Sequence, residues 1–150
     1  MPQSLALLLT HIIFSTKDRA PFLKPEIPGE LHAYLATVAR NLGCECFLVG
    51  GVEDHVHLAI GLSRTITAAK LVEQLKTASS HWLKTKAPLL NNFSWQSGYA
   101  IFSVSPQALP ALKSYIAEQE AHHKRTSFQD ELRGLLTKYG VAFNEKYLWD

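Results

Sequence analysis

The chain has 150 residues, a length at which we expect one domain, residues 1–150, built around one hydrophobic core. Hydrophobic residues make up 47% and charged residues 19%, a composition that excludes a disordered chain. The formal net charge of +2 excludes a polybasic protein that holds nucleic acid by bulk charge alone, although it leaves room for a local basic groove.

The cysteines and the apolar runs indicate the cellular compartment. Cys44 and Cys46 are separated by one residue, and a bridge between such near neighbours has poor geometry, so we expect a reducing compartment. No apolar run reaches membrane-spanning length, and the start of the chain lacks the basic segment of a signal peptide. We therefore expect a cytoplasmic protein without a membrane partner.

The first half of the chain predicts three strands and one helix. Residues 5–16, rich in Leu, Ile and Phe, are typical of a buried strand. Residues 29–42 carry apolar side chains three and four apart, which predicts a helix that Gly43 ends. Residues 44–52 and 55–62 are typical of strands, and we expect them to pair as a hairpin.

The second half predicts a long helix over 67–86, a strand over 93–105, a helix over 109–123 and a last helix over 128–139. An aromatic tail follows. The resulting order, β-α-β-β-α-β and then helices, predicts an α+β fold of the ferredoxin-like or RRM-like kind. Its antiparallel sheet is expected to carry helices on one face, with the C-terminal helices in addition.

The pair His55 and His57 is the first candidate for chemistry. Residues i and i+2 of a strand point to the same face, and two neutral imidazoles side by side suit a divalent metal with further ligands from elsewhere. A neighbouring carboxylate, Glu53 or Asp54, could orient an imidazole. The alternative is a pair of half-exposed strand histidines. His11 is either a buried structural histidine or a residue that lines the site.

Tyr115 and Gln119 form the second candidate. Spaced i and i+4 on a helix, they project from one face. A phenol can attack phosphorus to form a covalent ester, and an amide oxygen can complete the shell of a hard metal ion. A tyrosine packed against the sheet beside a surface glutamine explains the same spacing.

Basic residues form the third candidate, as contacts to a nucleic-acid backbone. Between residues 62 and 92 the chain has five basic residues and one acidic residue, and Trp82 or Trp95 could stack on bases. A solvated helix face explains the lysines equally well. The candidate DNA contacts are Arg64, Lys70, Lys76, Lys84 and Lys86, followed by His122, Lys124 and Arg125 at a helix end.

Five segments in a fixed order bring these candidates together. They are His11–Arg19, Asp54–Leu58, Trp95–Ser105, Tyr115–His123 and Phe143–Asp150. Over nearly the whole chain they resemble the single-tyrosine HUH transposases of insertion sequences, TnpA-like, and their REP-associated relatives. The pattern His-hydrophobic-His is matched by His55-Val56-His57.

The resemblance implies a transposase that cleaves and rejoins single-stranded DNA, folded as hairpins, at insertion-sequence ends through a 5′-phosphotyrosine link. By position, Tyr115 would be the nucleophile, and His55, His57 and Gln119 would hold Mg²⁺ or Mn²⁺. The resemblance also implies a homodimer in which the last strands, here residues 93–105, pair. In such dimers the tyrosine helix of one subunit can complete the histidine site of the other.

Two alternatives remain open. One is a metal-dependent nuclease in which water attacks and Tyr115 only positions the substrate; the shortage of further carboxylates near the histidine pair counts against it. The other is a non-catalytic or domesticated protein of the same fold that binds single-stranded nucleic acid, indifferently to metal and to the loss of His55 or His57.

Overall fold

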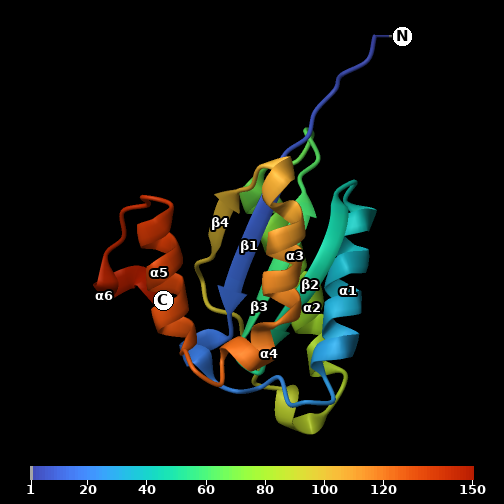
Figure 1. The fold of residues 1–150 in the computed structure, drawn as a ribbon. Helices are drawn as coiled ribbons and strands as arrows, with labels where there is room; N and C mark the ends of the chain where they lie inside the picture. Colours follow the sequence, from blue (N-terminus) through green and yellow to red (C-terminus); the bar gives the residue numbers. More distant parts are fainter. Residues whose placement is uncertain (1) are drawn as a thin grey trace.

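A computed structural model describes residues 2–150 (Figure 1). Four strands form one antiparallel sheet in the order β2-β3-β1-β4. The strands are β1 (Leu9–Ser15), β2 (Glu45–Val52), β3 (His55–Gly61) and β4 (Ala100–Ser103). The helices are α1 (Pro28–Asn41), α2 (Ala68–Lys84), α3 (Leu109–Ala117), α4 (Gln119–His122), α5 (Phe128–Lys138) and α6 (Glu145–Leu148), with short 3-10 turns at Lys17–Arg19, Pro88–Leu90 and Pro106–Ala108. The predicted α+β fold and its β-α-β-β-α-β order are confirmed.

The sheet separates two layers of helices (Figure 1). On one face, Ile12 and Phe14 of β1 pack into the main core with α1 and α2. On the other face, Ile13 packs with Phe102 of β4 and with the apolar side of α5, which begins at Phe128. The helices after β4 therefore lie on the face that α1 and α2 leave open, and they bury it.

α3 lies very close to β2, and Gly50 is the residue that permits this. A Cβ atom at Gly50 would lie 2.5 Å from the carbonyl oxygen of Ile116, a backbone atom that cannot swing aside. Ile116 follows directly after Tyr115, so the absence of a side chain at Gly50 sets how near the Tyr115 helix comes to the sheet.

The strand predicted over 93–105 is wrong in extent, because only Ala100–Ser103 pairs with β1. Before it, Phe93 and Trp95 are buried in the main core, and a single bridge joins Trp95 to Thr16. The ammonium group of Lys76 binds three consecutive carbonyl oxygens in the segment between Trp95 and β4, where the backbone does not form a strand. Its Nζ donates to the carbonyls of Gln96 at 2.8 Å, Ser97 at 3.3 Å and Gly98 at 2.6 Å.

The helix predicted over 109–123 is interrupted at Glu118, whose φ of −98° and ψ of 16° separate α3 from α4. The break matters because it makes Gln119 the first residue of α4, and the side chain of Gln119 is buried. The last predicted helix is confirmed as α5, and Gly140, with a φ of +67°, follows its end. Within residues 2–150, the helices are all too short or too polar to cross a membrane.

Candidate active site

His55 and His57 lie side by side on the inner face of β3, as the alternation of a strand predicts. Both side chains are fully buried, and their ring centroids are 5.0 Å apart. β3 is an inner strand of the sheet, paired with β2 and β1 on its two sides, so its backbone is held firmly. The two imidazoles are therefore presented from an inner strand toward α3, α4 and α5.

The carboxylate of Glu131 on α5 lies among three histidines. Its Oε1 is 3.0 Å from Nε2 of His57, 3.1 Å from Nε2 of His123 and 3.5 Å from Nε2 of His55. Glu131 reaches this place because it lies on the side of α5 that packs on the sheet, one residue before the buried Leu132. A charged group this deeply buried requires partners, and the histidines supply them.

The other ring nitrogen of each histidine has a partner of its own. The pairs are His55 Nδ1 with Asp54 Oδ1 at 2.7 Å, His57 Nδ1 with His11 Nε2 at 2.8 Å, and His123 Nδ1 with the Thr126 carbonyl oxygen at 2.7 Å. Histidines that bind metals are usually held this way, with one nitrogen on a second group and the other turned to the ion. The Asp54 contact matches the expectation that a neighbouring carboxylate orients an imidazole.

These four residues fit a divalent metal ion. One ligand atom each from His55, His57, His123 and Glu131 can be chosen so that all lie within 4.8 Å of one another. Three imidazole nitrogens and a carboxylate oxygen are an ordinary ligand set for Mn²⁺, Fe²⁺ or Zn²⁺, and they suit Mg²⁺ less well. Gln119 adjoins the group: its Oε1 is 3.2 Å from His55 Nε2, and its Nε2 donates to Glu131 Oε2 at 3.2 Å.

Tyr115 lies at the edge of the same cluster. Its hydroxyl donates a hydrogen bond to Oε2 of Glu131, and its ring meets His57 edge-on at a centroid distance of 5.7 Å. The ring of His11, which is stacked on His57, lies 6.1 Å from the Tyr115 ring. The structure thus brings the tyrosine and the histidine pair together within one chain. A phenol, a carboxylate and a candidate metal group in contact can support nucleophilic attack on a phosphate.

The histidines differ in the charge they favour. Burial lowers the pKa of His55, but the hydrogen bonds to Asp54 and Glu131 outweigh it and raise that pKa to about 9. Burial lowers the pKa of His57 to about 4, and burial together with the His57 ring lowers that of His11 to about 3. Without metal, His55 therefore carries a proton at neutral pH, whereas His57 and His11 are neutral.

The contact between Tyr115 and Glu131 keeps the phenol protonated. Burial raises the pKa of Tyr115 above its ordinary value, and the carboxylate of Glu131 raises it further. Burial opposes the charge on Glu131, but the hydrogen bonds from His123, His55 and His57 hold its pKa far below the usual range. A cation that shares the charge of Glu131 would make ionisation of Tyr115 easier.

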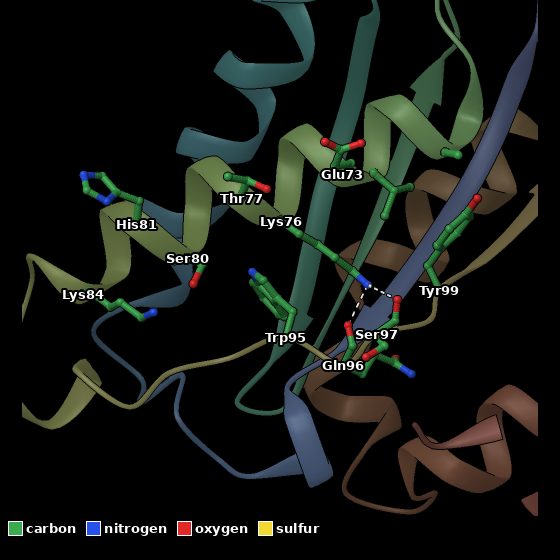
Figure 2. Close-up of a pocket in the computed structure, with 12 residues that line it drawn as sticks. Glu73, Lys76, Thr77, Ser80, His81, Lys84, Trp95, Gln96, Ser97 and Tyr99 are labelled. Atoms are coloured by element: carbon green, nitrogen blue, oxygen red, sulfur yellow. Dashed lines mark hydrogen bonds between the residues drawn. The ribbon is translucent and has the colours of Figure 1, made fainter. Parts of the chain in front are cut away.

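The basic residues of the α2 region lie across the sheet from this cluster. A groove of about 610 Å³ runs between α2 and the segment before β4, and Lys76 and Lys84 line it (Figure 2). Lys76 is tied to the three carbonyl groups described above, so it has a structural task. Lys70 pairs with Glu73 at 3.5 Å and Lys86 with Glu30 at 2.9 Å. Arg64 precedes α2.

The two tryptophans considered for base stacking are both engaged within the protein. Trp95 is buried, and its indole N–H donates to Ser79 Oγ at 2.9 Å, so it offers no face to a base. Trp82 stacks on Tyr34 at a centroid distance of 4.7 Å. By contrast, Lys124 and Arg125 are exposed just after α4, and Nε2 of His122 lies 3.3 Å from Glu131 Oε2. These three candidates border the cluster itself.

Glu131 is the residue that sequence reasoning missed, and His123 was left without a role of its own. The expected shortage of carboxylates near the histidine pair is wrong, because α5 delivers one from 74 residues further along the chain. A signal was present: Phe128, Leu132 and Leu135 mark the apolar stripe of α5, and Glu131 interrupts it. A charged residue on a buried stripe is typical of a functional group.

Comparisons with known proteins agree with this geometry. The family model described as IS200-like transposase matches residues 4–119. The ISDra2 transposase TnpA of Deinococcus radiodurans is 27% identical over 114 residues, covering 73% of this chain and 81% of that protein. A solved structure of a Deinococcus radiodurans R1 protein, assigned as a transposase, has a TM-score of 0.62 at 26% identity, covering 79% of this chain and 98% of that one. A REP-associated tyrosine transposase, solved with a REP hairpin, has a TM-score of 0.59 at 15% identity, and the match covers 82% of this chain and 74% of that one. A likeness at this identity shows the fold alone.

Proposed function

The chain belongs to the IS200-like transposase family, and on this premise we propose that it cleaves and rejoins single-stranded DNA at insertion-sequence ends through Tyr115. The observation that carries the proposal is the contact between the Tyr115 hydroxyl and Glu131, whose other oxygen faces three histidines. A nucleophile and a group suited to a metal meet there at one carboxylate. Such an arrangement can support attack on a phosphodiester.

In the proposed step, the Tyr115 oxygen attacks phosphorus and the bond from phosphorus to the 3′ oxygen breaks. Glu131 Oε2 accepts the hydrogen bond that orients the Tyr115 hydroxyl, the tyrosine proton leaves to water as the bond to phosphorus forms, and the leaving 3′ oxygen takes a proton from water. The product is a 5′-phosphotyrosine and a free 3′-hydroxyl. Since the link keeps the energy of the phosphodiester bond, a 3′-hydroxyl can reverse the step and rejoin the strands without ATP.

The metal ligands we propose are His55 and His57, with Gln119, Glu131 and His123 within reach of the same point. A bound divalent cation, Mg²⁺ or Mn²⁺, would neutralise charge on the scissile phosphate. Asp54, His11 and the Thr126 carbonyl oxygen hold the three imidazoles in place through their Nδ1 atoms. Gln119 keeps Glu131 turned toward Tyr115 through its amide N–H.

We further propose that the DNA substrate is an unpaired strand joined to a hairpin. Lys124, Arg125 and His122 would contact phosphates beside Tyr115, because they border the cluster. The groove of Figure 2, with Lys84 at its rim, would hold the backbone of the folded part. Arg64, Lys70 and Lys86 would add charge along the same side. The homodimer we propose pairs β4 with its copy, since β4 lies at the edge of the sheet.

The test uses end-labelled single-stranded DNA carrying the ends of the flanking element, with Mn²⁺ or Mg²⁺, followed by a denaturing gel. Tyr115→Phe is compared with wild type, and Tyr147→Phe serves as a matched control, since Tyr147 is an exposed tyrosine of α6 that belongs to neither the cluster nor the groove of Figure 2. We expect a metal-dependent covalent adduct with wild type and Tyr147→Phe, and none with Tyr115→Phe.

Glu131 also supports a second candidate function, a hydrolase in which the carboxylate activates water. Cleavage that survives in Tyr115→Phe without any adduct would establish the hydrolase and refute the tyrosine mechanism. Binding without cleavage by the wild type, on DNA of several elements, would leave a protein that only binds single-stranded DNA.

A further inference from the structure

A separate cavity of about 290 Å³ opens beside Tyr115, and the four residues of the candidate metal group are not among those that line it. Leu112 and Tyr115 of α3 form one wall, and Leu135 and Lys138 of α5 form the opposite wall. Tyr139 and His11 also line it. The mechanism proposed above uses only the hydroxyl of Tyr115, so the cavity itself has no task in it.

The lining of the cavity combines apolar, aromatic and basic groups. Leu112 and Leu135 provide apolar contact from opposite helices. The ring of Tyr139 is stacked on Phe102, at a centroid distance of 4.5 Å and an angle of 13°, so it is fixed in orientation. Lys138 is exposed, and its Nζ lies 5.6 Å from the centre of the Tyr139 ring. Apolar walls, an aromatic ring and an adjoining cation match a base attached to a phosphate.

We propose that this cavity binds the base of the nucleotide next to the scissile phosphate, with Lys138 on a neighbouring phosphate. This inference rests on the proposed function, because the DNA strand must pass Tyr115 for its base to reach the cavity. Small-molecule sites usually measure about 300–1,000 Å³, so a cavity of about 290 Å³ is large enough for one base. A base has to leave its pair to enter between the two helices, so the cavity takes an unpaired nucleotide and contributes to the choice of cleavage site.

Two variants fill the cavity from opposite walls, Ala111→Trp on α3 and Leu135→Trp on α5. Leu89→Trp is the matched control, because Leu89 is 86% exposed and remote from the site. Lys113→Ala is the control for Lys138→Ala, because Lys113 is an exposed lysine of α3 outside the cavity. Circular dichroism and thermal melts establish that each variant folds. If one filling variant does not fold, the other is enough for the test.

The first measurement incubates each protein with Mn²⁺ and a single-stranded oligonucleotide pool randomised over twelve positions, and sequences the DNA on both sides of the cleavage. We expect wild type and the controls to enrich one base at one position next to the scissile phosphate. In the filling variants this enrichment should vanish, and adduct yield should fall about tenfold or more, as for a lost stacking contact. Lys138→Ala should lower the yield without changing the preferred base. The same enrichment in wild type and both filling variants would overturn the proposal.

The second measurement does not depend on cleavage. Each of the four 2′-deoxynucleoside 5′-monophosphates is titrated into metal-free protein with labelled leucine methyl groups. We expect NMR shifts at Leu112 and Leu135 that are absent in Ala111→Trp, and no shift with any nucleotide would overturn the proposal. Methyl shifts without adducts support the cavity and refute the proposed function. Adducts without base preference and without methyl shifts refute the cavity and leave the proposed function standing.

Discussion

The hydroxyl of Tyr115 donates its hydrogen bond to the carboxylate of Glu131, sixteen residues further along the same chain. Since Glu131 also contacts His57 and His123, the tyrosine and the histidine pair of one chain share a single carboxylate. The structure therefore describes the arrangement in which a subunit uses its own tyrosine. Exchange of tyrosine helices between subunits would require this contact to open.

The first prediction concerns mixed subunits. Tyr115→Phe and His57→Ala are expected to be inactive alone, and equal amounts of the two should remain inactive together, because neither chain holds a complete site. Adduct formation on the denaturing gel is the measurement. Recovery of adduct in the mixture would show that the tyrosine acts on the site of the partner subunit. Wild type mixed with Tyr115→Phe controls for inhibition by the inactive chain.

The second prediction concerns the identity of the metal. Three imidazoles and one carboxylate should bind Mn²⁺ more tightly than Mg²⁺, on the order of tenfold or more. Glu131→Gln should weaken the affinity for both metals, because it removes the only carboxylate among the four candidate ligands. Isothermal titration calorimetry of the metal-free protein measures the affinities. Equal affinities for Mn²⁺ in wild type and Glu131→Gln would exclude Glu131 as a ligand.

The third prediction concerns His11, which holds His57 from behind at 2.8 Å. His11→Leu should lower the affinity for Mn²⁺ roughly 10–100-fold, as expected when a group behind a metal ligand is lost. His11→Gln keeps a polar partner for His57 Nδ1 and should recover part of the affinity. Calorimetry again provides the measurement. The idea fails if His11→Leu folds like wild type and binds Mn²⁺ with unchanged affinity.

The fourth prediction concerns stability against pH in the presence of EDTA. Because the pKa of His55 rises from 6.5 to about 9 on folding, its contribution is complete below pH 6.5 and is lost as the pH rises to 9. That contribution is on the order of 3 kcal/mol. His57, with a pKa lowered to about 4, acts oppositely, and its contribution is lost as the pH falls below 6.5. Asp54→Asn should therefore flatten the decline between pH 6.5 and 9, as measured by urea unfolding at several pH values. An unchanged decline would show that Asp54 does not hold the proton on His55.

The fifth prediction concerns Gly50. Gly50→Ala places a Cβ atom 2.5 Å from the Ile116 carbonyl oxygen, so it should push α3 away from the sheet and destabilise the fold by about 1–3 kcal/mol. Adduct formation should fall further than metal binding, because Tyr115 moves and the histidines do not. Gly134→Ala is the matched control: nothing lies within 4 Å of its Cβ, and it should stabilise α5 by about 0.4–1 kcal/mol. Equal activity in the two variants would contradict this role of Gly50.

The sheet and the histidine pair could be predicted from local patterns. Alternation along β3 places His55 and His57 on one face whatever the rest of the chain does, and the periodicity of α5 was visible in Phe128 and Leu132. Such signals depend on residues a few positions apart. They therefore located the elements, with errors mainly at their ends.

The rest of the site depends on contacts between distant segments. Glu131 joins the cluster only because α5 docks on Ile13 and Phe102, and no local pattern states where a helix docks. The start of β4 was misjudged for a similar reason, since the segment before it makes contacts with a distant element: Lys76 reaches across from α2 to bind its carbonyl groups. The sequence does not show in advance that a lysine of one helix binds the backbone of this segment.

The bond between His11 Nε2 and His57 Nδ1 holds one hydrogen between two neutral rings. While His57 donates from Nε2 to Glu131, that hydrogen belongs to His11. If the lone pair of His57 Nε2 is given to a cation instead, the hydrogen of His57 moves from Nε2 to Nδ1, and His11 Nε2 becomes the acceptor. The hydrogen of His11 then moves to its other nitrogen. Because His11 also lines the cavity beside Tyr115, a change of tautomer in two buried rings would report the state of the metal group to the place where a base enters.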